Sequence, residues 1–98
     1  MFEKTGIKDN VTDEICSLAR KHGLNKVILF GSRARNDFKD RSDIDLAVSG
    51  GDIASFMLDI EEDVNTLLFF DIVNLDGPAD QELLKSIHRE GVLIYEKV

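Results

Sequence analysis

Asp43 and Asp45 are the residues of this sequence whose type and spacing point most directly to chemistry. They stand one residue apart at the start of the apolar segment 44–48. Because alternate residues of a strand point to the same side, both carboxylates would face one way, while Ile44 and Leu46 face the core. Two carboxylates this close repel each other in the absence of a cation. Magnesium takes oxygen ligands and usually shares them with substrate phosphates, so the pair predicts a Mg²⁺ site.

A Gly-Ser turn precedes this pair. Gly31 and Ser32 follow the apolar segment 27–30, and the ten residues 33–42 separate them from the first aspartate. A glycine after a strand lets the backbone turn sharply and approach a ligand. The opening of a helix offers unpaired N–H groups to a phosphate. Arg33 and Arg35 are candidates for forked contacts to phosphate oxygens, with different roles if a short helix forms, because residues two apart do not share a helix face.

Asp71 completes the candidate site. It stands in the apolar segment 68–73, where burying a charge is costly. If its strand pairs beside strand 44–48, Asp71 joins the same face as the other two carboxylates. It could then bridge the metal and take the proton from an attacking hydroxyl. Taken alone, a Gly-Ser turn, an Asp-x-Asp or a strand aspartate is a weak signal, but together they predict a two-metal phosphoryl or nucleotidyl transfer site.

The rest of the chain predicts the elements that position these residues. Apolar spacing and turn residues indicate one helix over about residues 10–22, a second that begins at residue 52, and a third after the turn 76–78. They also indicate strands at 27–30, 44–48, 67–75 and 92–95. A short helix opens after the Gly-Ser turn, and residues 1–8 form a loose segment. Phe69 and Phe70 are expected in the core. The alternation predicts an α/β fold, a mixed sheet of about four strands with helices packed on it, and the length predicts a single domain, 1–98.

Composition narrows the classes of function. The chain has 12 basic and 19 acidic residues, a net charge of −7. A nucleic-acid partner is not expected, because such partners normally need a net basic face. The lone Cys16 fits a reducing cytosol, and no apolar segment approaches the length of a membrane span, so we expect a cytoplasmic protein with no membrane contact.

The central residues resemble the signature of the DNA polymerase beta-like nucleotidyltransferase superfamily, Gly31-Ser32 followed after ten residues by Asp43-x-Asp45. The segments 42–48 and 90–96 are similar to those of its minimal nucleotidyltransferases, the MNT or MntA type. The resemblance implies the nucleotidyltransferase fold, with two Mg²⁺ ions held by Asp43 and Asp45 and with Asp71 as the third carboxylate. It also implies that Gly31 and Ser32 bind the β- and γ-phosphates of a nucleoside triphosphate.

The same resemblance implies a partner. Minimal nucleotidyltransferases are commonly paired with HEPN-domain proteins in toxin–antitoxin systems, where the MNT antitoxin adenylylates a tyrosine of the HEPN ribonuclease from ATP. The expected function is therefore AMP transfer to a partner protein. The alternative is an antitoxin that neutralises a HEPN partner by binding alone, although the intact set of carboxylates weighs against it. Size and net charge disfavour a stand-alone polymerase.

Overall fold

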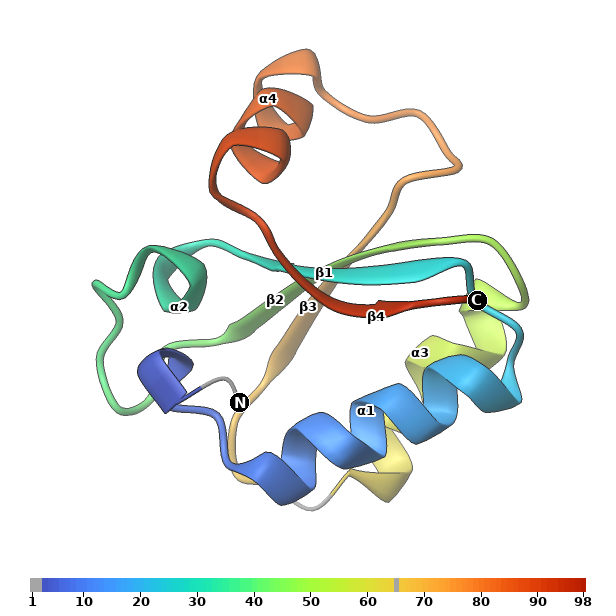
Figure 1. Cartoon of the computed structure of the whole chain (residues 1–98), viewed down its shortest axis with the longest axis horizontal. Helices are drawn as coiled ribbons and strands as arrows, with labels where there is room; N and C mark the ends of the chain where they lie inside the picture. The colour runs from blue at the N-terminus through green and yellow to red at the C-terminus, as the bar shows by residue number, and fades with distance from the viewer. Residues whose placement is uncertain (1–2, 65) are drawn as a thin grey trace.

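The strands form one mixed four-stranded sheet. We describe residues 3–64 and 66–98 of a computed structural model (Figure 1). The strand order is β3-β2-β1-β4, with β1 antiparallel to both β2 and β4, and β2 parallel to β3. The strands are β1 Lys26–Phe30, β2 Ile44–Ser49, β3 Phe70–Asn74 and β4 Val92–Glu96. The predicted mixed sheet is thus confirmed.

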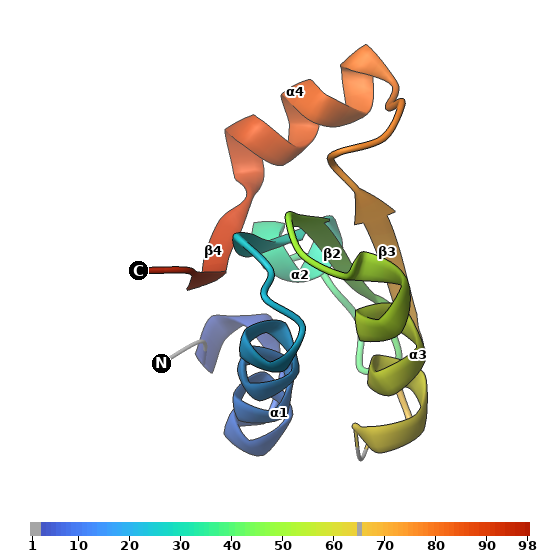
Figure 2. The ribbon, with the colours of Figure 1, turned by 90° about the vertical axis from the view of Figure 1, so that its right-hand side faces the viewer.

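Helices cover both faces of the sheet. The helices α1 (Asp9–Lys21) and α3 (Ile53–Asp63) lie on one face, and α4 (Gln81–Glu90) lies on the other (Figures 1 and 2). The single turn α2 (Ser32–Arg35) follows β1, and a 3₁₀ turn, η1 (Glu3–Thr5), precedes α1. No helix in the described ranges is long and apolar enough to span a bilayer.

The two faces of β2 differ in character. Ile44, Leu46 and Val48 are fully buried in the apolar cluster that includes α1 and α3. Ala47 belongs to a smaller cluster on the α4 side, with Phe30 among its members. Because side chains alternate along a strand, Asp45 falls on this second face, as the sequence predicts.

Two boundaries differ from the sequence prediction. The third strand begins at Phe70, and the residues before it form an exposed loop in which Leu67 is 95% and Phe69 79% exposed. The prediction that Phe69 lies in the core is therefore wrong, whereas Phe70 does pack against the core. The predicted loose segment 1–8 lies partly outside the described residues, and its described part includes η1 and a buried Thr5.

Candidate active site

Parallel pairing of β2 and β3 brings two of the three predicted carboxylates together. Asp45 and Asp71 are direct register partners, the second pair of a ladder that runs from Ile44 with Phe70 to Val48 with Asn74. Asp43 is exposed and lies two residues before Asp45, just ahead of β2. The strand adjacency that the sequence prediction required is therefore present. Asp71 itself is exposed, so the burial that its apolar segment suggested is not found.

The electrostatics of Asp45 reflect this crowding. Burial raises the pKa of the Asp45 carboxyl, and the neighbouring charges of Asp71 and Asp43 raise it further. Arg35 and Arg33 lower this pKa, as weaker influences. The charges of Asp71 and Asp43 thus both act on Asp45.

Magnesium fits the donor chemistry of this set. Carboxylate oxygens are the ligands that Mg²⁺ takes, and a cation would relieve the mutual repulsion that raises the pKa of Asp45. In the described ranges, no three His, Cys, Asp or Glu side chains form a ready metal-binding group. Binding an ion would therefore require the carboxylate side chains to turn toward it, and the metal-ligand roles of Asp43, Asp45 and Asp71 stay predictions.

The turn between β1 and α2 brings the backbone against Asp45. Gly31 has φ 75° and ψ −156°, a conformation that is essentially restricted to glycine. A Cβ atom at this position would collide with the Oδ2 atom of Asp45. The predicted need for glycine here thus has two causes, the backbone conformation and the closeness of a candidate metal ligand.

Ser32 is the first residue of α2, directly beside this turn. The helix is only four residues long and is followed by Asn36, whose N–H donates to Ser32 O. The first N–H groups of a helix have no acceptor within it, so they remain available to an anion. The structure therefore places Gly31 and Ser32 next to Asp45, as a phosphate-binding turn requires, while their contact with a nucleotide stays a prediction.

The two arginines of α2 have different surroundings. Arg33 is 2% exposed, and its guanidinium donates to backbone carbonyls of Thr5, Asp40 and Ser42. Arg35 lies on the surface, where Nη1 donates to Glu90 at 2.7 Å and Nε to Asp37 at 3.1 Å. These contacts do not test the predicted phosphate role of Arg33, but they favour a structural role for it. Arg35, by contrast, could exchange its exposed partner Asp37 for a phosphate.

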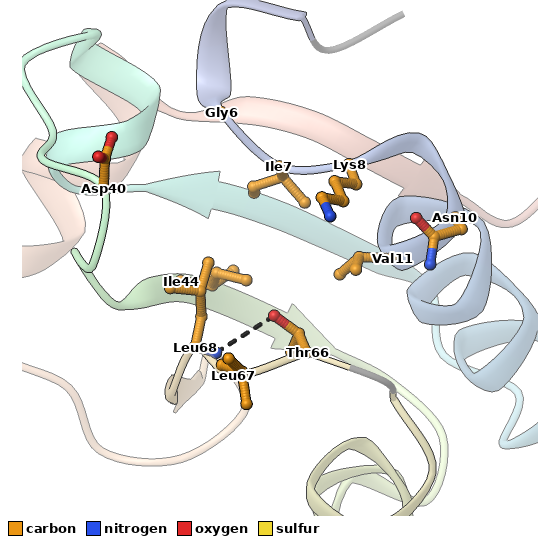
Figure 3. Close-up of a pocket in the computed structure, with 10 residues that line it drawn as sticks. All are labelled: Gly6, Ile7, Lys8, Asn10, Val11, Asp40, Ile44, Thr66, Leu67 and Leu68. Atoms are coloured by element: carbon orange, nitrogen blue, oxygen red, sulfur yellow. Dashed lines mark hydrogen bonds between the residues drawn. The ribbon is translucent and has the colours of Figure 1, made fainter.

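A hollow of about 460 Å³ lies elsewhere, between the start of α1 and the loop before β3 (Figure 3). Ile44 contributes to its lining. Because Ile44 and Asp45 point to opposite faces of β2, this hollow is on the other face from the carboxylates. The candidate carboxylates therefore do not line this cavity.

Sequence reasoning missed several residues around the site. Thr5, Gly6 and Phe38 surround Arg33, and Glu90 binds Arg35. The only visible signal in the sequence is Phe38, an aromatic residue in a charged loop. The contacts to Arg33 depend mainly on backbone carbonyls, which carry no residue-specific pattern.

A family model described as "Polymerase beta, Nucleotidyltransferase" matches residues 13–98. No protein of curated function matches the sequence. A solved structure that is provisionally assigned as a minimal nucleotidyltransferase is 31% identical to this chain. Its TM-score is 0.63, and the match covers 83% of this chain and 86% of that one.

Toxin–antitoxin complexes also contain chains of this fold. A crystal structure of a toxin–antitoxin with AMP-PNP matches with a TM-score of 0.71 and 26% identity, covering 88% of this chain and 73% of that one. A complex of a tri-AMPylated Shewanella oneidensis HEPN toxin with an MNT antitoxin matches with a TM-score of 0.64 and 23% identity. That match covers 89% of this chain and 71% of that one. With its mixed sheet, its Gly-Ser turn and a family match over most of its length, the chain belongs to the polymerase beta nucleotidyltransferase family.

Proposed function

We propose that this chain is a Mg²⁺-dependent nucleotidyltransferase that moves AMP from ATP to a hydroxyl of a HEPN-domain toxin, and so acts as the antitoxin. The observation that carries the proposal is the register pairing of Asp45 with Asp71, beside the Gly31 turn. The AMP-PNP complex and the tri-AMPylated HEPN toxin among the structural relatives support the choice of nucleotide and acceptor.

In the proposed reaction, the acceptor oxygen attacks the α-phosphorus of ATP. The bond from that phosphorus to the bridging oxygen breaks, and pyrophosphate leaves. Asp71 would take the proton from the acceptor hydroxyl. Asp43 and Asp45 would hold two Mg²⁺ ions, which when bound neutralise phosphate charge and stabilise the attacking and leaving oxygens.

The turn and the surface arginine would hold the triphosphate. The N–H groups at Gly31 and Ser32 would donate to the β- and γ-phosphates, close to Asp45. Arg35 would swing from Glu90 or Asp37 to a phosphate oxygen, because a doubly charged phosphate competes well with a single carboxylate.

Asp43→Asn tests the reaction. We expect AMP transfer to fall about a thousand-fold or more, because the variant loses a charged ligand of the site. The measurement is mass spectrometry of a HEPN-domain protein co-expressed with this chain, together with incorporation from labelled ATP by the purified pair. Asp43 is exposed and outside the strand, so the circular dichroism spectrum should not change.

Asp63→Asn is the matched control, because Asp63 is an exposed carboxylate at the end of α3, away from the carboxylate face. It should transfer AMP like the wild type. Undiminished incorporation by Asp43→Asn would contradict the mechanism.

Neutralisation by contact alone is the second candidate function. It is favoured by the exposure of Leu67 and Phe69, since large apolar side chains exposed together commonly mark interaction surfaces. A triple variant, Asp43→Asn, Asp45→Asn and Asp71→Asn, discriminates between the two functions. Loss of protection of cells from the HEPN protein would favour catalysis, and full protection would favour binding.

A further inference from the structure

Arg33 is a buried cation whose hydrogen bonds join two separate segments to α2. Nη1 donates to Thr5 O at 2.8 Å, Nε and Nη2 donate to Ser42 O at 3.0 and 2.9 Å, and Nη2 also donates to Asp40 O at 3.2 Å. Buried charges persist where their hydrogen bonds are satisfied, and these carbonyls satisfy most of the guanidinium.

The loop held by Arg33 leads directly to a candidate metal ligand. Ser42 immediately precedes Asp43 in the chain. The loop is also closed on itself, because Lys39 N donates to Ser42 Oγ at 2.8 Å and Ser42 N donates to Lys39 O at 3.0 Å. Fixing the Ser42 carbonyl therefore fixes the backbone from which Asp43 projects.

Phe38 and, from the N-terminal segment, Gly6 also pack against Arg33. Phe38 stacks on Arg33, with the guanidinium carbon 4.8 Å from the ring centroid. Gly6, at φ +70°, lies so close that an added Cβ would be 2.7 Å from Phe38 Cζ and 2.8 Å from Arg33 Nη1. Figure 3 shows Gly6 and Asp40 on two different segments that border the same hollow.

Part of this arrangement lies before the residues that match the family model. The family match begins at residue 13, whereas Thr5 and Gly6 come before it. The family match therefore does not account for the contacts that η1 and Gly6 make with the loop.

We propose that Thr5, Gly6, Arg33, Phe38 and Ser42 form a latch that positions Asp43 for metal binding, with Arg33 as a positioning residue that does not contact the nucleotide. The latch rests on the proposed function for its role in catalysis, but its effect on the loop can be measured without activity. The segment before residue 13 thereby helps to position the candidate active site.

The test compares Arg33→Lys and Gly6→Ala in the full chain. Lysine at position 33 keeps the positive charge but loses the forked N–H donors of the guanidinium. Alanine at position 6 would bring its Cβ too close to Phe38 and Arg33 without removing either side chain. Both variants should raise the Mg²⁺ concentration for half-maximal AMP transfer about 10- to 100-fold, the usual range for residues that orient metal ligands. The KM for ATP at saturating Mg²⁺ should stay near the wild-type value, because the Gly31 turn is untouched.

Two readouts are independent of activity. Hydrogen exchange of the amides at 39–43 should accelerate at least tenfold in both variants, while exchange in α1 and α3 stays unchanged. Mn²⁺ affinity, measured by electron paramagnetic resonance, should fall in parallel. A double variant should lose little more than either single variant, because both changes open the same latch.

Matched controls separate the latch from general strain. Gly23→Ala introduces the same left-handed strain, at φ +69°, at a site with no atom within 4 Å of the added Cβ. Arg41→Lys repeats the arginine change at an exposed position of the same loop. Neither control should alter Mg²⁺ dependence or exchange at 39–43.

The outcomes are distinct. A raised KM for ATP with unchanged exchange at 39–43 would show that Arg33 contacts phosphate, and would overturn the latch. Wild-type exchange and Mn²⁺ affinity in Gly6→Ala would overturn it as well. If the wild type transfers no AMP, the proposed function fails, yet exchange and Mn²⁺ binding still decide whether the latch exists.

Discussion

Asp45→Asn is expected to abolish AMP transfer and, in the absence of metal, to make the folded protein more stable. The loss of transfer should be about a thousand-fold or more, about 4 kcal/mol of transition-state stabilisation, because a charged ligand of the site is removed. The gain in stability has a separate cause. Asp45 is partly buried beside Asp71 and Asp43, so its negative charge is unfavourable in the metal-free fold.

The sign of the pH dependence follows from the raised pKa of Asp45. Between the unfolded and the folded pKa of this carboxyl, the folded protein binds more protons than the unfolded chain. The free energy of unfolding of the metal-free wild type should therefore fall as pH rises through that window and stay lower at neutral pH. Asp45→Asn should remove this part of the pH dependence.

Thermal unfolding with and without Mg²⁺ checks both effects. For a domain of this size, each 1 kcal/mol corresponds to about 4–8 °C in Tm. The variant should have the higher Tm in chelator, and the wild type should gain more from added Mg²⁺, because only a bound ion stabilises the fold by mass action. Asp63→Asn should behave like the wild type. A lower Tm for Asp45→Asn in chelator would contradict the electrostatic account.

Gly31→Ala is expected to damage both stability and transfer. Alanine would have to adopt φ 75° and ψ −156°, and its Cβ would collide with Asp45 Oδ2. Such backbone strain costs about 1–3 kcal/mol, and displacing Asp45 adds to that cost. The free energy of unfolding should fall by about 2–4 kcal/mol, measured by urea denaturation. Transfer should fall as well, because the phosphate turn and a metal ligand are both displaced.

Two other glycines divide this cost into its parts. Gly23→Ala carries left-handed strain with no neighbour within 4 Å, so it should lose only the strain component. Gly77→Ala meets its nearest atom at 3.8 Å, has no positive φ, and should stay within about 1 kcal/mol of the wild type. In an Asp45→Ala background, Gly31→Ala should cost less than in the wild type. Equal losses at all three glycines would contradict the proposed collision.

The sequence predicted the second strand and the facing of Asp45, because both depend on local alternation. Ile44 and Leu46 are buried while Asp45 lies on the other face, as a period of two requires. Asp71 could be placed only conditionally, because no local pattern says which strands are neighbours. The observed β2–β3 pairing supplies that condition.

The errors concern long-range packing. Phe69 reads as core because it continues an apolar run, yet the strand begins one residue later and leaves its ring exposed. The sequence also did not reveal the surroundings of Arg33, whose predicted phosphate role stays a prediction. Its partner carbonyl at Thr5 is 28 residues away in the chain, and any residue type could provide that carbonyl. Residue identity alone therefore could not distinguish the buried Arg33 from the exposed Arg35.

The parallel alignment of β2 with β3 also protects the chemistry against register slippage. A slip of one residue would turn Asp71 toward the α1–α3 core and turn Phe70 and Ile72 away from it. That misalignment would forfeit part of the about 1.5–3 kcal/mol that full burial of a large apolar side chain contributes, since Phe70 and Ile72 are half-buried, and it would bury a charge as well. The apolar face of the edge strand β3 thus fixes the register that places Asp71 beside Asp45. Selection for a well-packed core therefore also preserves the spacing of these two carboxylates.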